Sequence, residues 1–215
     1  MSQRDLTLAE ARVLGVLMEK QATVPDTYPL SLNALTAGCN QKTARDPVMN
    51  LSEQDVLAAL EGLRELHLIN EVSGNRVTRY QHNAPRGLGV PGAAAALLAV
   101  LALRGPQTAA ELRANAERLH RFADTSSVDA FLDELAGKTP PRVLKLARSP
   151  GEREARWAHL LCGEAAVPAV TARAASPAAA AGGVDAEAFA ALQAEVATLR
   201  AQVQRLASEL GVDLA

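Results

Sequence analysis

The segment from Cys39 to Asn50, CNQKTARDPVMN, combines a thiol with several hydrogen-bond donors and shows neither helical nor strand periodicity. Its amide and basic side chains could donate to phosphates or to the carboxylates of a partner: Asn40, Gln41, Lys42 and Arg45. The alternative is that Asn40 and Asp46 satisfy local backbone groups, as such residues do in turns. The segment therefore predicts a shaped connection first, and second a contact surface that also stabilises the turn.

Enzymatic chemistry finds little support in the sequence. Cys39 has no histidine nearby in the sequence to activate it, so we predict a small buried hydrophobe rather than a nucleophile. The four histidines show no metal-ligand spacing with each other or with the two cysteines: His67, His82, His120 and His159. There is also no Gly-rich phosphate loop after a strand, no serine elbow and no clustered carboxylate pair. We therefore predict a protein that is not an enzyme and that uses no metal or cofactor.

The basic residues of the middle third are the main candidates for contacting nucleic acid. Residues 84–163 hold 11 basic and 8 acidic residues, whereas residues 1–83 hold 8 and 10, and residues 164–215 hold 3 and 6. Phosphate contacts position a protein without reading sequence. The candidate DNA-contacting residues are Arg113, Arg118, Arg121, Lys145, Arg148, Arg153 and Arg156. The alternative is a solvated hairpin whose arginines pair with Glu152 and Glu154.

Helical periodicity and capping signals predict three helices and a hairpin in residues 1–83. The first helix carries Arg12, Glu19 and Lys20 on its predicted outer face. The predicted N-cap residues are Thr7, Ser31 and Ser52, with Glu10 and Asp55 completing capping boxes. Gly38 is predicted just past the end of the second helix. A turn at residues 73–75 then predicts a hairpin.

The same order of elements repeats in residues 84–163, after a predicted linker at residues 83–91. Three apolar-patterned segments are followed by a hairpin with a Pro150-Gly151 turn. Thr108 with Glu111 is predicted to cap the second of these helices, and Ser126 with Asp129 the third. We therefore predict a mainly α fold with small β-hairpins. It consists of two tandem winged helix-turn-helix domains, residues 1–83 and 84–163.

The last part of the chain predicts a flexible tether and a coiled coil. Residues 164–183 are rich in Ala, Pro and Gly, and residues 184–215 form a heptad pattern. The predicted seam consists of Phe189, Leu192, Val196, Leu199, Val203, Leu206 and Leu210. Valines at two a positions with leucine at every d position favour a parallel two-stranded coiled coil, and hence a homodimer. The alternative is a lone amphipathic helix that folds back on the body.

Cysteine usage and hydropathy indicate the compartment. The two cysteines lie far apart, and the chain shows no secretory signal pattern, which predicts a reduced, cytoplasmic protein. The one long apolar run, residues 92–103, is too short to span a bilayer. We therefore expect a buried helix there and no membrane partner.

Three stretches of the chain resemble the YceH-like family of bacterial proteins: LTLAEARVLGVLMEK, PDTYPLSLNALTAGCNQKTARDPVMNLSE and RVTRYQH. The resemblance covers residues 6–83 closely and residues 84–163 more loosely. It implies two winged-helix domains, and the family has no established biochemical function. The chain departs from the pattern at Ala44, where an Asn is expected, and at Val24, where a Thr is expected.

Both predicted third helices are acidic, and this charge disfavours DNA binding by these helices. The third helix of such a domain enters the major groove, where carboxylates oppose binding to phosphates. The carboxylates in question are Glu53, Asp55, Glu61 and Glu65 in the first domain and Asp129, Asp133 and Glu134 in the second. Two functions remain: a dimeric DNA-associated regulator making mostly sequence-independent phosphate contacts, or an adaptor that docks a protein. The commonest use of the fold favours the first.

Overall fold

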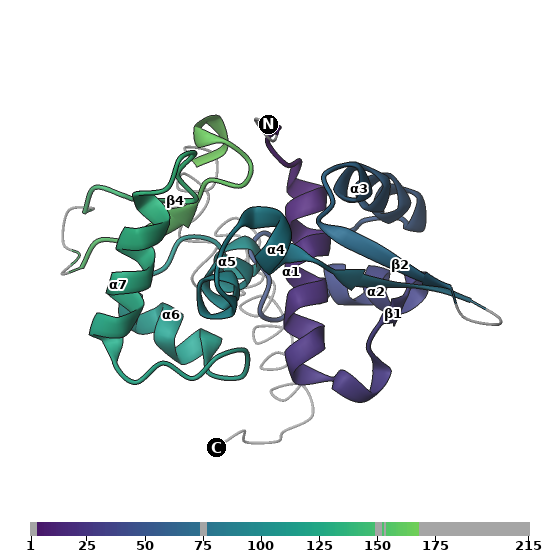
Figure 1. Ribbon diagram of the computed structural model, residues 1–215, viewed down its shortest axis with the longest axis horizontal. Coiled ribbons are helices and arrows are strands. Elements are labelled where there is room, and N and C mark those ends of the chain that lie inside the picture. Colours follow the sequence, from purple (N-terminus) through teal and green to yellow (C-terminus); the bar gives the residue numbers. More distant parts are fainter. Residues whose placement is uncertain (1–3, 74–76, 149–151, 153, 168–215) are drawn as a thin grey trace, which may run out of the picture. The chain divides into compact units, whose positions relative to one another are not determined.

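Seven α-helices and two small antiparallel sheets make up the described residues of the computed structural model (Figure 1). These are residues 4–73, 77–148, 152 and 154–167, and they fall within one compact unit of the chain. The predicted combination of helices with small antiparallel hairpins is confirmed. Within the described residues, none of the helices has the length and apolar character needed to cross a membrane. The predicted coiled-coil residues, Phe189 to Leu210, lie outside the described range.

The first half of the fold, residues 4–82, follows the predicted order. Its elements are α1 (Leu8–Thr23), the 3-10 helix η1 (Pro25–Thr27), β1 (Leu30–Ser31), α2 (Leu32–Cys39), α3 (Glu53–Glu65), β2 (Ile69–Ser73) and β3 (Thr78–His82). The capping boxes of α1 and α3 are both formed, and Ser31 caps α2 as predicted. β2 and β3 pair from Ile69↔His82 to Ser73↔Thr78, which confirms the hairpin. β1 joins the other edge of β3, so the strand order is β1-β3-β2.

The predicted role of Gly38 is wrong. Gly38 lies inside α2, which continues to Cys39 and ends at Asn40. A Cβ atom at position 38 would lie 2.7 Å from Cγ1 of Val16 on α1. The glycine therefore permits close packing of two helices, and it does not form the turn that a glycine near a helix end usually signals.

The second half, residues 84–167, contains one helix that the sequence did not predict. Its elements are α4 (Ala84–Leu88), α5 (Gly92–Arg104), α6 (Ala109–Ala116), α7 (Thr125–Ala136), β4 (Val143–Lys145), β5 (Trp157–His159) and the 3-10 helix η2 (Glu164–Ala166). α4 occupies the predicted linker, and its residues Ala84 and Leu88 are buried. η2 lies at the start of the predicted tether, separated from β5 by four residues, and Val167 is buried.

The caps of the second half are partly as predicted. Thr108 and Glu111 form the expected capping box of α6. The predicted cap of α7 is wrong, because Asp124 is the N-cap residue and Ser126 lies within the helix. The Asp124 carboxylate accepts from the Ser127 amide at 2.8 Å, which places the start of α7 two residues earlier. Both positions match a capping pattern, and Asp124 with Ser127 forms the capping box that the structure has.

A short backbone pairing in the second half corresponds to the pairing of β1 with β3 in the first half. Gln107, just before the N-cap of α6, exchanges two backbone hydrogen bonds with Trp157 of β5, at 3.1 and 2.7 Å. In the first half, β1 pairs with β3 at the same place, immediately before α2. Each half therefore contains, in the same order, a helix, a strand or bridge residue, two more helices and a hairpin whose second strand takes that pairing, and the second half adds α4 before them and η2 after them.

The hydrophobic core runs through both halves. α1, the first helix of the first half, packs against the second half. α1 packs against α3 on one side and α5 on the other (Figure 1). A Cβ atom at Gly15 would lie 3.0 Å from Cγ of Leu103, so the glycine permits the close approach of α1 and α5. α5 is buried over most of its length, as predicted for residues 92–103.

Candidate functional site

The connection between α2 and α3, residues 39–50, is held closed by its own side chains. The Asn40 amide donates to the Leu51 carbonyl at 2.8 Å and accepts from the Leu51 N–H at 2.7 Å. The Asp46 N–H donates to the Leu103 carbonyl of α5 at 2.7 Å. Ala44 adopts a left-handed conformation, with φ of 57°, which Asn adopts more readily than Ala. The connection is therefore ordered and bonded to both halves of the fold.

The Arg45 side chain is buried, and its hydrogen bonds are made within the protein. Its side chain is 0% exposed, and its guanidinium contacts both carboxylate oxygens of Glu19, at 2.6 and 3.1 Å. It also donates to the Gly38 carbonyl at 3.1 Å and to the Gln41 side chain at 2.7 Å. Arg45 and Gln41 therefore hold the connection against α1. The structure removes Arg45 from the predicted contact surface, where Lys42 remains exposed.

Arg12 is a structural residue that sequence reasoning missed. It was predicted on the outer face of α1, yet it is 1% exposed. Its guanidinium donates to the Cys39 carbonyl at 3.1 Å and to the Pro47 carbonyl at 2.6 Å, which are at the two ends of the turn. Its Nε has no partner among the described residues. A charged residue on a helix usually indicates a solvated face, but here the connection folds over that face and supplies the carbonyls.

Cys39 is buried and unsuited to nucleophilic chemistry. The side chain is 0% exposed, as predicted. Burial raises the pKa of the thiol to about 12, although the charges of Arg12 and Arg45 act in the opposite direction. Since the thiolate is the reactive form, Cys39 stays protonated near neutral pH.

Several of the predicted DNA-contacting residues are engaged within the second half. The Arg156 guanidinium lies 2.9 Å from the Glu111 carboxylate and 3.1 Å from that of Glu152, so the alternative of a paired hairpin holds for this residue. The ammonium group of Lys145 lies 5.0 Å from the centre of the Trp157 ring. Arg113 donates to the Ala123 carbonyl at 3.1 Å.

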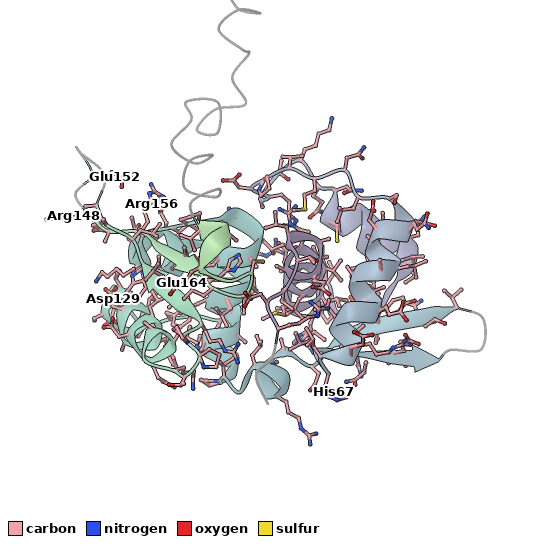
Figure 2. The ribbon with its side chains drawn as sticks, turned by 90° about the horizontal axis from the view of Figure 1, so that it is seen from above. His67, Asp129, Arg148, Glu152, Arg156 and Glu164 are labelled. Atoms are coloured by element: carbon pink, nitrogen blue, oxygen red, sulfur yellow. The ribbon has the colours of Figure 1, made fainter. Side chains whose placement is uncertain are left out.

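Three arginines of the predicted set remain free to contact a ligand. Arg118, Arg121 and Arg148 are exposed and make no ion pair within the described part of the chain. Figure 2 shows Arg148 at the same end of the second half as Arg156 and Glu152. Arg153 lies outside the described residues. Of the other candidates, Arg113 and Lys145 are also exposed, whereas Arg156 is half-buried.

The outward face of α3 is acidic and carries an exposed leucine. Glu53, Leu57, Glu61 and Glu65 follow one another at four-residue spacing, and all four are exposed. Leu57 is 45% exposed. Arg64 lies 3.3 Å from Glu61 and 3.4 Å from Glu71, so it neutralises only part of this charge. The corresponding helix α7 exposes Asp133 and Glu134.

The histidines do not assemble a metal site. No group of three potential His, Cys, Asp or Glu ligands occurs among the residues that the structure describes. Burial lowers the pKa of both His82 and His159 to about 4. His82 is hydrogen-bonded to the Gln21 side chain at 2.7 Å, and His120 packs edge-on against Phe122. These contacts give His82 and His120 packing roles.

Comparisons with known proteins find relatives over nearly the whole chain. Residues 6–152 match the family model described as "Protein of unknown function, DUF480". The chain is 66% identical to a UPF0502 protein of Leptothrix cholodnii, over 98% of each chain. It is 61% identical to a UPF0502 protein of Burkholderia pseudomallei, over 98% of this chain and 92% of the relative. For a UPF0502 protein of Paraburkholderia xenovorans the identity is 59%, over 99% and 91%.

Proposed function

We propose, from the premise that the chain belongs to the DUF480 family of bacterial proteins of unknown function, that it is a non-enzymatic adaptor. Its partner would be a basic segment of another protein. Membership in this family is consistent with the resemblance to YceH-like proteins. The docking surface in this proposal is the outward face of α3, which consists of Glu53, Leu57, Glu61 and Glu65.

The order of elements supports two winged-helix domains as the scaffold. In each half, a helix, a strand or bridge residue, two helices and a hairpin follow one another, with the three-part pairing β1-β3-β2 in the first half. The third helix of such a domain is the element that meets DNA or other partners. In this chain that element is α3 in the first half and α7 in the second.

The single observation that carries the proposal is the charge of the exposed α3 face. Three glutamates surround an exposed leucine on this face. Carboxylates there repel the phosphates of a duplex, whereas complementary charge favours a basic partner and speeds its encounter. The leucine supplies apolar area, which an interface core needs. A basic segment with an apolar side chain therefore fits this face better than DNA does.

The adaptor is tested by reversing the charge of α3. Glu53→Lys combined with Glu61→Lys is expected to abolish capture of the partner by crosslinking in native lysate treated with nuclease. The matched control combines Asp26→Lys and Glu117→Lys, which are exposed carboxylates away from α3. The control changes the net charge equally and should retain the partner. Equal loss in both double variants, or retention in both, would show that α3 is not the docking surface.

DNA binding is the second candidate, favoured by Arg118, Arg121 and Arg148, which are exposed and unpaired within the described residues. If they contact phosphates, duplex binding at low salt should weaken steeply as salt rises. Replacing all three by Ala should then flatten the salt slope by about one unit per lost contact. Lys42→Ala serves as the control and should leave the slope nearly unchanged. Fluorescence anisotropy on a random duplex across a salt series gives the answer, and an absence of binding at the lowest salt rejects this candidate.

The proposal includes self-association and a cytoplasmic location. The heptads of residues 184–215 support a parallel homodimer, which would present two α3 faces to the partner. Cys39 and Cys162 are both free thiols, which fits a reducing compartment.

A further inference from the structure

A small cavity at the junction of the two halves is lined by an arginine, Arg142, that forms no ion pair among the described residues. The cavity has a volume of about 140 Å³. Its lining includes the apolar side chains of Leu6, Leu68, Leu88 and Leu161 and the charged residues Arg4, Asp5 and Arg142. The volume corresponds to that of roughly four to five liquid water molecules. The space therefore suits a molecule of only a few heavy atoms.

Arg142 and Arg104 are the two half-buried arginines that make no ion pair among the described residues, and Arg142 is the one that lines the cavity. Arg4, Arg45 and Arg156 each have a carboxylate oxygen within 2.9 Å. Arg12 donates to two carbonyls, at 3.1 and 2.6 Å. The Arg142 guanidinium is half-buried and makes one long hydrogen bond, 3.4 Å to the Leu88 carbonyl, and no ion pair among the described residues. Burial without a compensating charge lowers its pKa.

The backbone holds Arg142 firmly in this position. Its N–H donates to the Leu135 carbonyl at 2.9 Å, and its carbonyl accepts from the Leu160 N–H at 2.8 Å. These bonds connect the end of α7 to the segment after β5. The side chain therefore projects from a fixed point, and a guanidinium in a fixed position offers paired donors that match a carboxylate.

The other charged groups at the cavity leave Arg142 available. The Arg4 guanidinium is bound to both oxygens of Glu10, at 2.6 and 2.9 Å. The Asp5 carboxylate lies against Gly163, where it would collide with any added Cβ atom, and it makes no ion pair with Arg142. An incoming carboxylate would therefore find Arg142 without an ion pair, in a lining that also holds the Asp5 carboxylate.

We propose that this cavity binds a short aliphatic monocarboxylate, whose carboxylate pairs with Arg142 and whose hydrocarbon tail contacts the leucine walls. The inference is independent of the adaptor function. Pairing offsets the cost of a half-buried guanidinium, and the leucine side chains of the lining offer apolar contact to the hydrocarbon tail. The cavity volume limits the ligand to the size of butyrate.

The test uses the full chain with sodium butyrate and its neutral isostere butyramide at matched ionic strength. Butyrate at ten times its Kd should raise the Tm by about 3–6 °C, because only the folded state binds it. Butyramide should produce no shift. In ¹⁵N spectra, the Nε–Hε resonance of Arg142 should move on butyrate addition and remain in place with butyramide.

Two variants separate binding at this cavity from a general salt effect. Arg142→Gln should weaken butyrate binding at least about 10-fold, because a charge-assisted pair is lost. Arg148→Gln removes an exposed arginine elsewhere in the second half and should bind butyrate as the parent does. The Tm of each variant without ligand reports whether it is folded. If butyramide binds as well as butyrate, or if Arg142→Gln binds like the parent, the proposal is overturned.

Discussion

Replacing Arg45 by alanine is expected to lower the free energy of unfolding by about 3–5 kcal/mol, because it leaves a largely buried Glu19 carboxylate with only the Lys20 ammonium, 3.4 Å away. The Gly38 carbonyl also loses a donor, and α1 loses the two hydrogen bonds that Arg45 donates to Glu19. For a chain of this length the corresponding drop in Tm is roughly 6–20 °C. Urea unfolding of the parent and the variant measures the difference.

The matched control is Arg64→Ala, which breaks exposed pairs with Glu61 and Glu71. Exposed pairs of this kind contribute at most about 1 kcal/mol. If both variants lose a similar small amount, the Arg45 network is not what holds the connection in place.

The stabilising effect of the Arg45–Glu19 pair should also depend on pH. Burial raises the pKa of Glu19, but the hydrogen bond and charge of Arg45, with the charge of Lys20, outweigh it and bring the pKa below 4.5. A carboxyl whose pKa is lower in the folded state stabilises the fold above its unfolded pKa, and that stabilisation is lost as pH falls through the folded pKa. The stability difference between the parent and Glu19→Gln should therefore shrink as pH falls below 4.5. A constant difference from pH 7 to pH 3 would contradict this account.

Removing residues 184–215 is expected to convert a homodimer into a monomer, because the heptad seam from Phe189 to Leu210 is lost. Multi-angle light scattering at micromolar protein concentration should give twice the chain mass for the full chain. It should give one chain mass for a version that ends at Gly183. The expected change is complete, since a parallel coiled coil is the proposed basis of association.

Point variants separate the seam from the rest of the segment. Leu199→Lys places a charge at a d position and should favour the monomer, whereas Gln204→Lys places the same charge at a solvated b position and should leave the dimer intact. A full chain that is monomeric at these concentrations rejects the coiled coil. A dimer that survives the truncation would place the association surface on residues 1–183.

Local signals predicted the secondary structure well because they act over three or four residues. The capping boxes at Thr7, Ser52 and Thr108 and the β2–β3 hairpin were all confirmed. The errors occurred where two local interpretations were possible. Gly38 matched a helix end but serves helix packing, and residues 84–88 matched a linker but form α4 with two buried side chains.

The sequence by itself determined the order of the elements except α4 and the short 3-10 helices, the acidic character of α3 and α7, and the burial of Cys39. Only the tertiary structure decided which charged residues are free. Arg45 pairs with Glu19 across 26 residues, and Arg156 pairs with Glu111 across 45. Arg142 meets the Leu88 carbonyl across 54 residues and finds no carboxylate there. The physical reason is that periodicity and capping follow from neighbours along the chain, whereas the partner of a charged side chain depends on which distant segments the shared core brings together.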